Sequence, residues 1–366
     1  MIRADLDLPA SIAGLLTTIP VLCMGLMAPF GPRIAARLGP ERAFAACLAA
    51  IAGFGVLRAV TPSVPLLLAV TLGIGIGIGV AGAIPSMIVA RRIPTRPALG
   101  TGAYAGGIVA GSTIAAAVAV PLAFGDDWQR TFLLVSLGSI VALVAWLALV
   151  GVRNSRPSGG PRRAIRLPWA SSTAWLLVLL FGLQSILYYG IVAWLPNAYV
   201  ERGWSTADAG ALLAIFNGIG LITTIGVPLV ADRLGSRRLQ LLLASAASVI
   251  ALLGITLLPD PALLWVTILG LALGVVFPLV LTLPLDVSDD PGTTGAAAAL
   301  MLLGGYLLAA LGPFALGAAR DATGDFTVSL WLLVVVAGVM VAACTLLTPD
   351  RLRRGIARVP VLSSPA

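Results

Sequence analysis

Long apolar runs separated by short polar breaks occupy most of this chain. Each run is long enough for a helix to cross the hydrocarbon core of a bilayer, which takes about 20 residues. The runs are continuous rather than alternating, which favours helices over strands. We therefore predict an all-α membrane protein with eleven transmembrane helices, at residues 9–31, 43–60, 64–90, 98–123, 130–152, 171–196, 206–230, 239–258, 261–285, 294–318 and 326–348.

The run at 171–196 carries polar side chains in its middle, including Gln184 and Tyr188. These two residues are four apart and share one helical face. Lipid cannot satisfy an amide or a hydroxyl, so they should face other helices or a wet cavity. Two interpretations stay open, namely hydrogen bonding between helices and the lining of a substrate site. Trp194, near the end of the run, is expected to be an interfacial anchor.

Composition agrees with a membrane class, since 59% of the residues are hydrophobic and 10% are charged. The net charge of +8 comes from 23 arginines without a lysine. A nucleic-acid partner is not expected, because the arginines alternate by loop. Eighteen lie in one set of loops and the C-terminal tail and five in the other, which places the first set in the cytoplasm and the N-terminus outside. The expected location is the plasma membrane, with multiple passes.

Residues suited to catalysis or metal binding are scarce. The chain has no histidine, and Cys23, Cys47 and Cys344 fall inside predicted spans, where they should behave as small apolar residues. Without clustered ligands or paired acid and base groups, we expect neither an enzyme nor a metal or other cofactor. The expected partners are the lipid bilayer and a small molecule, with the chain acting as a monomer.

The chain contains an internal repeat. Residues 31–42 align with 227–238 at an offset of 196, which places Gly39 on Gly235. We predict an N-terminal bundle at 1–152 and a C-terminal bundle at 171–348, joined by a basic cytoplasmic linker at 153–170 and followed by a tail at 349–366.

Glycine and proline also recur in matching spans. Gly77 and Pro85 correspond to Gly270 and Pro278 at an offset of 193. Paired interruptions of this kind point to a binding site near the middle of the membrane, with Pro85 and Pro278 at kinks beside a cavity. The alternative is that both prolines are inert kinks. The glycine run at 72–79 lies inside an apolar span and indicates close helix packing rather than a dinucleotide site.

A short basic loop follows the seventh run. It resembles a loop motif of the major facilitator superfamily, and we assign it as a cytoplasmic gate consisting of Asp232, Arg233, Gly235, Arg237 and Arg238. An aspartate at a helix end can sit against the positive N-terminus of a neighbouring helix and latch that side shut. A solvated basic turn is the alternative. The first copy has Ala36 at the position of the acid, so the latch is expected only in the second half.

Other motifs bring the resemblance closer. Residues 181–196 and 201–210, then 304–313 with 321–324, are similar to the cyanate permease and 2-nitroimidazole transporter group. The resemblance implies a twelve-span major facilitator fold of two pseudo-symmetric bundles, alternating access and a small anionic or weakly polar substrate. We therefore expect a permease whose substrate-binding candidates are Gln184, Tyr188, Asn217, Tyr104 and Tyr306. The rival hypothesis is a non-transporting relative, either a sensor or a defective fragment.

The repeat also predicts a missing helix. Subtracting 196 from the span at 171–196 places its partner immediately before Met1. In the group that the chain resembles, that span carries Asn-Leu-Arg-Pro, and residues 1–4 look like the end of its exit sequence. An arginine there would suit an anion, because Arg58 lies at a predicted outer end. We expect a first span to be absent, through a misplaced start or a truncation, and the 366-residue chain alone to transport poorly.

Overall fold

A computed structural model describes residues 6, 8–61, 63–82, 84–92, 107–108, 110–115, 118, 128–152, 167–230, 236–286 and 291–348. Its elements there are all helical: α2 (Ala10–Met27), α3 (Phe30–Leu38), α4 (Pro40–Ala59), α5 (Val64–Ala81), α6 (Ile84–Arg92), α8 (Trp128–Ala145), the π-helical η1 (Trp146–Val150), α9 (Ser172–Glu201), α10 (Thr206–Val230), α11 (Arg237–Leu257), α12 (Ala262–Thr282), the 3₁₀-helical η2 (Leu283–Asp286), α13 (Pro291–Thr323) and α14 (Thr327–Thr345).

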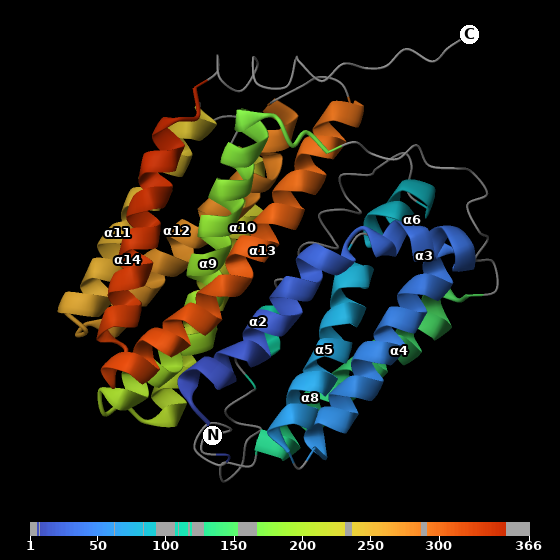
Figure 1. Cartoon of the computed structure of the whole chain (residues 1–366), viewed down its shortest axis with the longest axis horizontal. Helices are drawn as coiled ribbons and strands as arrows, with labels where there is room; N and C mark the ends of the chain where they lie inside the picture. The colour runs from blue at the N-terminus through green and yellow to red at the C-terminus, as the bar shows by residue number, and fades with distance from the viewer. Residues whose placement is uncertain are drawn as a thin grey trace.

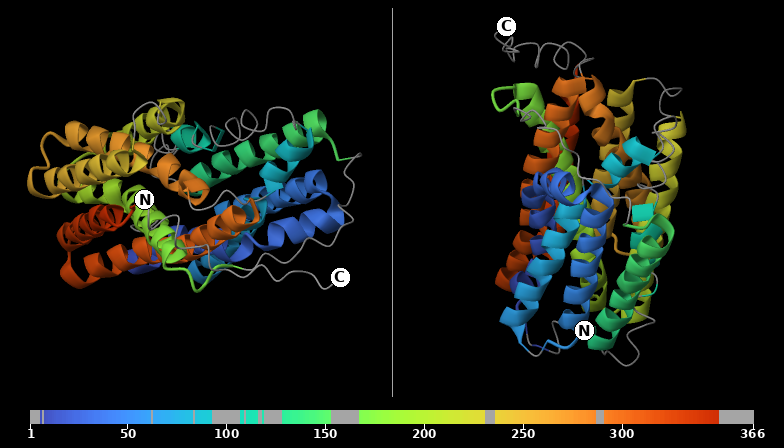
Figure 2. Two further views of the ribbon diagram at one scale, coloured as in Figure 1. Left: turned by 90° about the horizontal axis from the view of Figure 1, so that it is seen from above. Right: turned by 90° about the vertical axis from the view of Figure 1, so that its right-hand side faces the viewer.

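Two groups of helices, α2–α8 and α9–α14, lie side by side (Figure 1; Figure 2). Within the described residues, ten helices are long and apolar enough to cross a membrane, as the hydrophobic pattern predicts. The predicted span at 98–123 falls mostly outside those residues. The span at 64–90 is divided between α5 and α6, because Pro85 lies in the first turn of α6, where a proline costs no helical hydrogen bond.

Helix α9 is the central element of the C-terminal group. In its most apolar stretch 67% of the residues are buried, against 6% in the span formed by α8 and η1. It begins where the Ser171 hydroxyl accepts the Ala174 N–H at 3.1 Å, and it continues through Pro196 to Glu201. The prediction that Trp194 is an interfacial anchor is wrong. Its side chain is buried, and its Nε1–H donates to the Pro313 carbonyl at 2.8 Å, which joins α9 to α13.

The glycines of α5 pack against neighbouring helices, which confirms the prediction made from the glycine run. A Cβ at Gly75 would lie 3.0 Å from the Cys23 sulfur on α2, and one at Gly77 would lie 2.8 Å from Ile51 on α4. Because interior packing is dense, side chains at these positions would push the helices apart. The three cysteines are buried and free, as expected for cysteines that behave as small apolar residues.

The two groups meet along a seam between α2 and α13 (Figure 1). A Cβ at Gly14 would lie 2.6 Å from the Pro313 carbonyl oxygen, and one at Gly317 would lie 2.5 Å from that of Ala10. One turn beyond Gly14 on α2, the Thr18 hydroxyl donates to the Ala310 carbonyl at 3.0 Å. The two backbones therefore touch directly near the ends of the helices that are predicted to be extracellular.

We expect Gly317→Ala to lower the thermal unfolding temperature of the purified protein in detergent, because the added methyl overlaps Ala10. Overpacking of this kind costs about 1–3 kcal/mol. Gly338→Ala is the matched control, since a Cβ there meets nothing within 4 Å. Equal melting temperatures for the two variants would contradict the close contact of α2 with α13.

Candidate functional site: a cavity between the two groups

A cavity of about 450 Å³ lies between the two groups of helices. Its volume falls in the range typical of small-molecule sites. None of the lining residues is charged. They come from α2 and α5 with the residues that follow each, from the described residues 107–108 and 110–115, and from α9, α10, α12 and α13. They are Met24, Ala28, Ile78, Gly79, Gly82, Ile108, Ser112, Gln184, Ser185, Tyr188, Tyr189, Phe216, Asn217, Gly220, Thr224, Gly270, Leu273, Gly274, Phe277, Leu302 and Tyr306.

Three polar side chains join the two groups across this cavity. The Tyr188 hydroxyl on α9 donates to Oδ1 of Asn217 on α10 at 3.0 Å. Ser112, from the N-terminal group, has its Oγ 3.2 Å from that hydroxyl, and it donates to the same Asn217 oxygen at 3.5 Å. Asn217 is held in place by its own helix, because its Nδ2 donates to the Leu213 carbonyl at 3.0 Å. The cluster presents hydroxyl and amide groups in an otherwise apolar space.

Gln184 lies one turn before Tyr188 and is buried. Its Oε1 accepts the Ser185 hydroxyl at 3.2 Å, and both residues line the cavity. An amide whose oxygen already has a partner still has two N–H donors. Gln184 is therefore suited to bind an acceptor atom of a ligand.

Aromatic rings form another part of the lining. Tyr188 and Tyr189 meet edge to face with their centroids 5.2 Å apart, and Tyr188 lies 6.0 Å from Phe216. Tyr306 on α13 lines the cavity and packs edge to face on Phe181, at 5.0 Å. Such surfaces can contact a planar ring or a small π-system without requiring a charge.

The structure thus places four of the sequence-predicted binding residues, Gln184, Tyr188, Asn217 and Tyr306, around one cavity. Tyr104 lies outside the described residues. Neither of the two prolines is part of the lining. Pro85 lies in the first turn of α6, and Pro278 is buried inside α12.

Pro278 acts on the cavity wall through its effect on the backbone. It has no N–H, so the carbonyl of Gly274, four residues earlier, loses its helical partner. The Thr224 hydroxyl on α10 donates to that carbonyl at 3.2 Å. The carbonyl that Pro278 leaves without a helical partner is therefore satisfied from a second helix, and Gly274 and Thr224 both line the cavity.

Sequence reasoning missed several lining residues, notably Ser112, Phe216 and Thr224. Ser112 lies in a run of small residues, and nothing in its immediate sequence distinguishes it from its neighbours. Thr224 could have been found from Pro278, because a proline inside a helix leaves a carbonyl that requires a donor.

The arginine-rich ends of both groups are held by ion pairs. Arg237, at the start of α11, contacts Asp286 at the end of η2 at 2.7 Å. In the N-terminal group, Glu41 at the start of α4 contacts Arg92 at the end of α6 at 3.4 Å. Glu41 and Arg237 are related by the repeat offset of 196, so the two halves use the same contact with the charges exchanged.

Only part of the predicted gate motif is described. Arg238 donates to the Thr345 carbonyl at 2.9 Å, which fixes the start of α11 to the end of α14. Three motif residues lie outside the described residues, namely Asp232, Arg233 and Gly235. Their role as a latch stays a prediction.

The chain is similar to known proteins in both sequence and structure. The family model described as Major Facilitator Superfamily matches residues 1–313. The 2-nitroimidazole transporter of Escherichia coli (strain K12) is 30% identical over 346 residues, or 93% of this chain and 86% of that protein. The cyanate transport protein CynX of the same organism is 32% identical over 321 residues, or 86% of this chain and 82% of that protein. A crystal structure of a D-xylose-proton symporter superimposes with a TM-score of 0.76 at 16% identity, over 95% of this chain and 91% of that one.

We expect Thr224→Val to destabilise the protein by about 1–3 kcal/mol, because it leaves the buried Gly274 carbonyl without a donor. Chemical denaturation in detergent would measure the loss. Thr256→Val is the matched control, since the Thr256 hydroxyl only supplements a regular turn of α11, at the Leu252 carbonyl. Equal losses in the two variants would rule out the stabilising role given to Thr224.

Proposed function

The chain belongs to the Major Facilitator Superfamily, a family of transporters, and from this we propose that it is a permease for a small, weakly polar or anionic compound. The substrate is cyanate-like or nitroimidazole-like, and it crosses the plasma membrane by alternating access of one central site. The protein acts as a monomer. The observation that carries the proposal is the uncharged cavity between the two groups of helices, with its hydrogen-bonding cluster.

The lining favours the weakly polar class over the anionic one. Moving an ion from water into a space without a countercharge is costly, whereas a neutral polar compound needs only a few hydrogen bonds. Gln184 supplies donors, and Tyr188 and Tyr306 supply ring surface. A planar heteroaromatic compound with an acceptor group, such as a nitroimidazole, fits both features.

Uptake by cells expressing the chain tests the proposal. We expect accumulation of labelled 2-nitroimidazole, and of cyanate to a lesser extent, above the level of an empty-vector control. If neither compound nor related small acids move, although the protein is found in the membrane, the rival hypothesis of a non-transporting relative is favoured.

Gln184→Ala and Tyr188→Phe should each lower the flux per molecule roughly tenfold, the loss expected for one hydrogen bond of about 1–1.5 kcal/mol. Protein levels in the membrane should stay unchanged. Ser248→Ala serves as the control, because it removes a buried hydroxyl that bonds only within its own helix. If the first two variants lower the amount of protein and leave flux per molecule intact, these residues are packing contacts.

Asp232 is proposed to hold the cytoplasmic side shut in one state, together with the arginines of its loop. Asp232→Asn should then raise the reactivity of cysteines introduced on the cytoplasmic face and lower that of cysteines on the outer face. Labelling that is unchanged on both faces would remove the latch from the account.

A further inference from the structure

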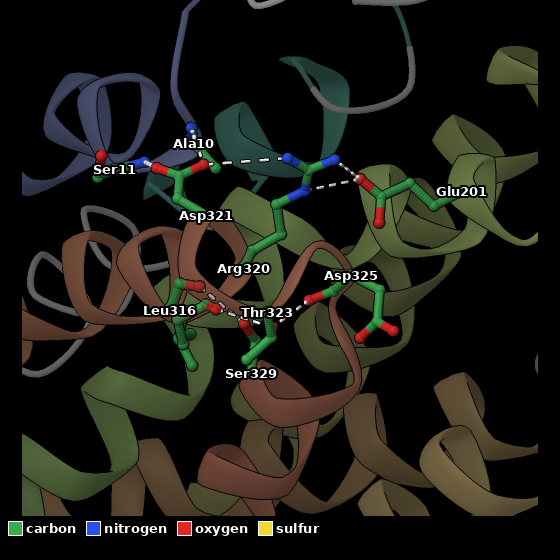
Figure 3. A network of polar contacts seen from close by, with 10 residues as sticks. Ala10, Ser11, Glu201, Leu316, Arg320, Asp321, Thr323, Asp325 and Ser329 are labelled. Atoms are coloured by element: carbon green, nitrogen blue, oxygen red, sulfur yellow. Dashed lines mark hydrogen bonds and ion pairs between the residues drawn. The ribbon is translucent and has the colours of Figure 1, made fainter.

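The outer end of the α2–α13 seam carries a polar contact that the cavity does not explain (Figure 3). The Asp321 carboxylate, near the end of α13, accepts two backbone hydrogen bonds from the other group of helices. Its Oδ1 accepts the Ala10 N–H at 2.7 Å, and its Oδ2 accepts the Ser11 N–H at 2.7 Å. These are the first two amides of α2, which no carbonyl of that helix can satisfy.

We propose that Asp321 is an outer latch, which closes the extracellular side of the transporter by binding the N-terminus of α2 across the two halves. A carboxylate suits this position, because the partial positive charge of a helix N-terminus adds to two short charge-assisted hydrogen bonds. The latch rests on the proposed alternating access, in which the two outer ends must separate.

Asp321 is held firmly on its own side. The preceding residue, Arg320, contacts Oε1 of Glu201, at the end of α9, from Nη2 at 2.9 Å and Nε at 3.0 Å. Its Nη1 lies 3.9 Å from Oδ1 of Asp321. Figure 3 shows Arg320 between the two carboxylates. Gly317, one turn earlier on α13, brings the backbone against Ala10. When the outer ends separate, Asp321 therefore parts from α2, while Arg320 keeps its contact with Glu201 on α9.

Asp325, four residues further on, has a different role. Its Oδ1 accepts the N–H of Thr327, the first residue of α14, at 2.8 Å, and this bond lowers the pKa of the Asp325 carboxyl. In the described part of this region, Asp321 is the carboxylate that reaches across to α2.

The latch can be tested by measuring distances between the outer ends of the two halves. Spin labels at Val60, after α4, and Leu258, after α11, would sit at exposed positions with 68% and 61% of their surface accessible. Asp321→Asn keeps the shape of the side chain but removes its charge and one of its two acceptors. Pulsed electron paramagnetic resonance should then show the ratio of outer-open to outer-closed protein rising roughly tenfold, as expected for loss of a charge-assisted hydrogen bond.

A second pair of variants changes the other partner. Ser11→Pro removes the N–H that Oδ2 accepts, at a position in the first helical turn where proline is tolerated. Ser11→Ala keeps that N–H. The first should raise the open population and the second should not. If Asp321→Asn fails to reach the membrane, the Ser11 pair decides the question.

The latch would be overturned if folded Ser11→Pro shows the same distance distribution as the wild-type protein, and Asp321→Asn, where it folds, does so too. The readout does not depend on flux. A shifted distribution in a protein that moves no compound would therefore leave the latch standing and contradict only the proposed transport.

Discussion

The direct contact between the backbones of α2 and α13 is the constraint on which this structure depends. Gly14 and Gly317 leave no side chain between the helices, so the two groups approach closely at one end. In lipid, helices associate by packing and hydrogen bonding, because there is no hydrophobic gain in leaving one apolar medium for another. The seam supplies both, through its glycines and through the Thr18 bond to Ala310. Both helices also line the cavity, α2 with Met24 and α13 with Tyr306.

The chemistry of the cavity follows from its position between two apolar bundles. A charge there would lack water, so polar side chains are tolerated where they satisfy one another. Tyr188, Asn217 and Ser112 do this while facing the cavity. Pro278 adds a constraint of its own, since the carbonyl that it leaves unpaired receives a donor from α10. The helices that form the walls of the cavity therefore also satisfy the carbonyl that Pro278 leaves unpaired.

Much of the architecture could be predicted from the sequence, because a bilayer allows few solutions for long apolar runs. Hydropathy located the ten spans described, and the glycine run of α5 indicated its close packing. Gln184 and Tyr188 were found because polar groups in such runs need partners. Ser112 was not, since a serine among small residues carries no comparable signal. Trp194 was misassigned, because position along a span does not show whether a side chain faces lipid or a neighbouring helix.

Protection of a cysteine introduced at Ser112 is the measurement that tests the central claim most directly, since Ser112 lines the cavity and the native cysteines are buried. Alkylation of this cysteine in the presence of increasing 2-nitroimidazole would report whether the cavity is the binding site. The account predicts protection that saturates at the same concentration as transport does. Saturable transport with an alkylation rate that never changes would contradict it.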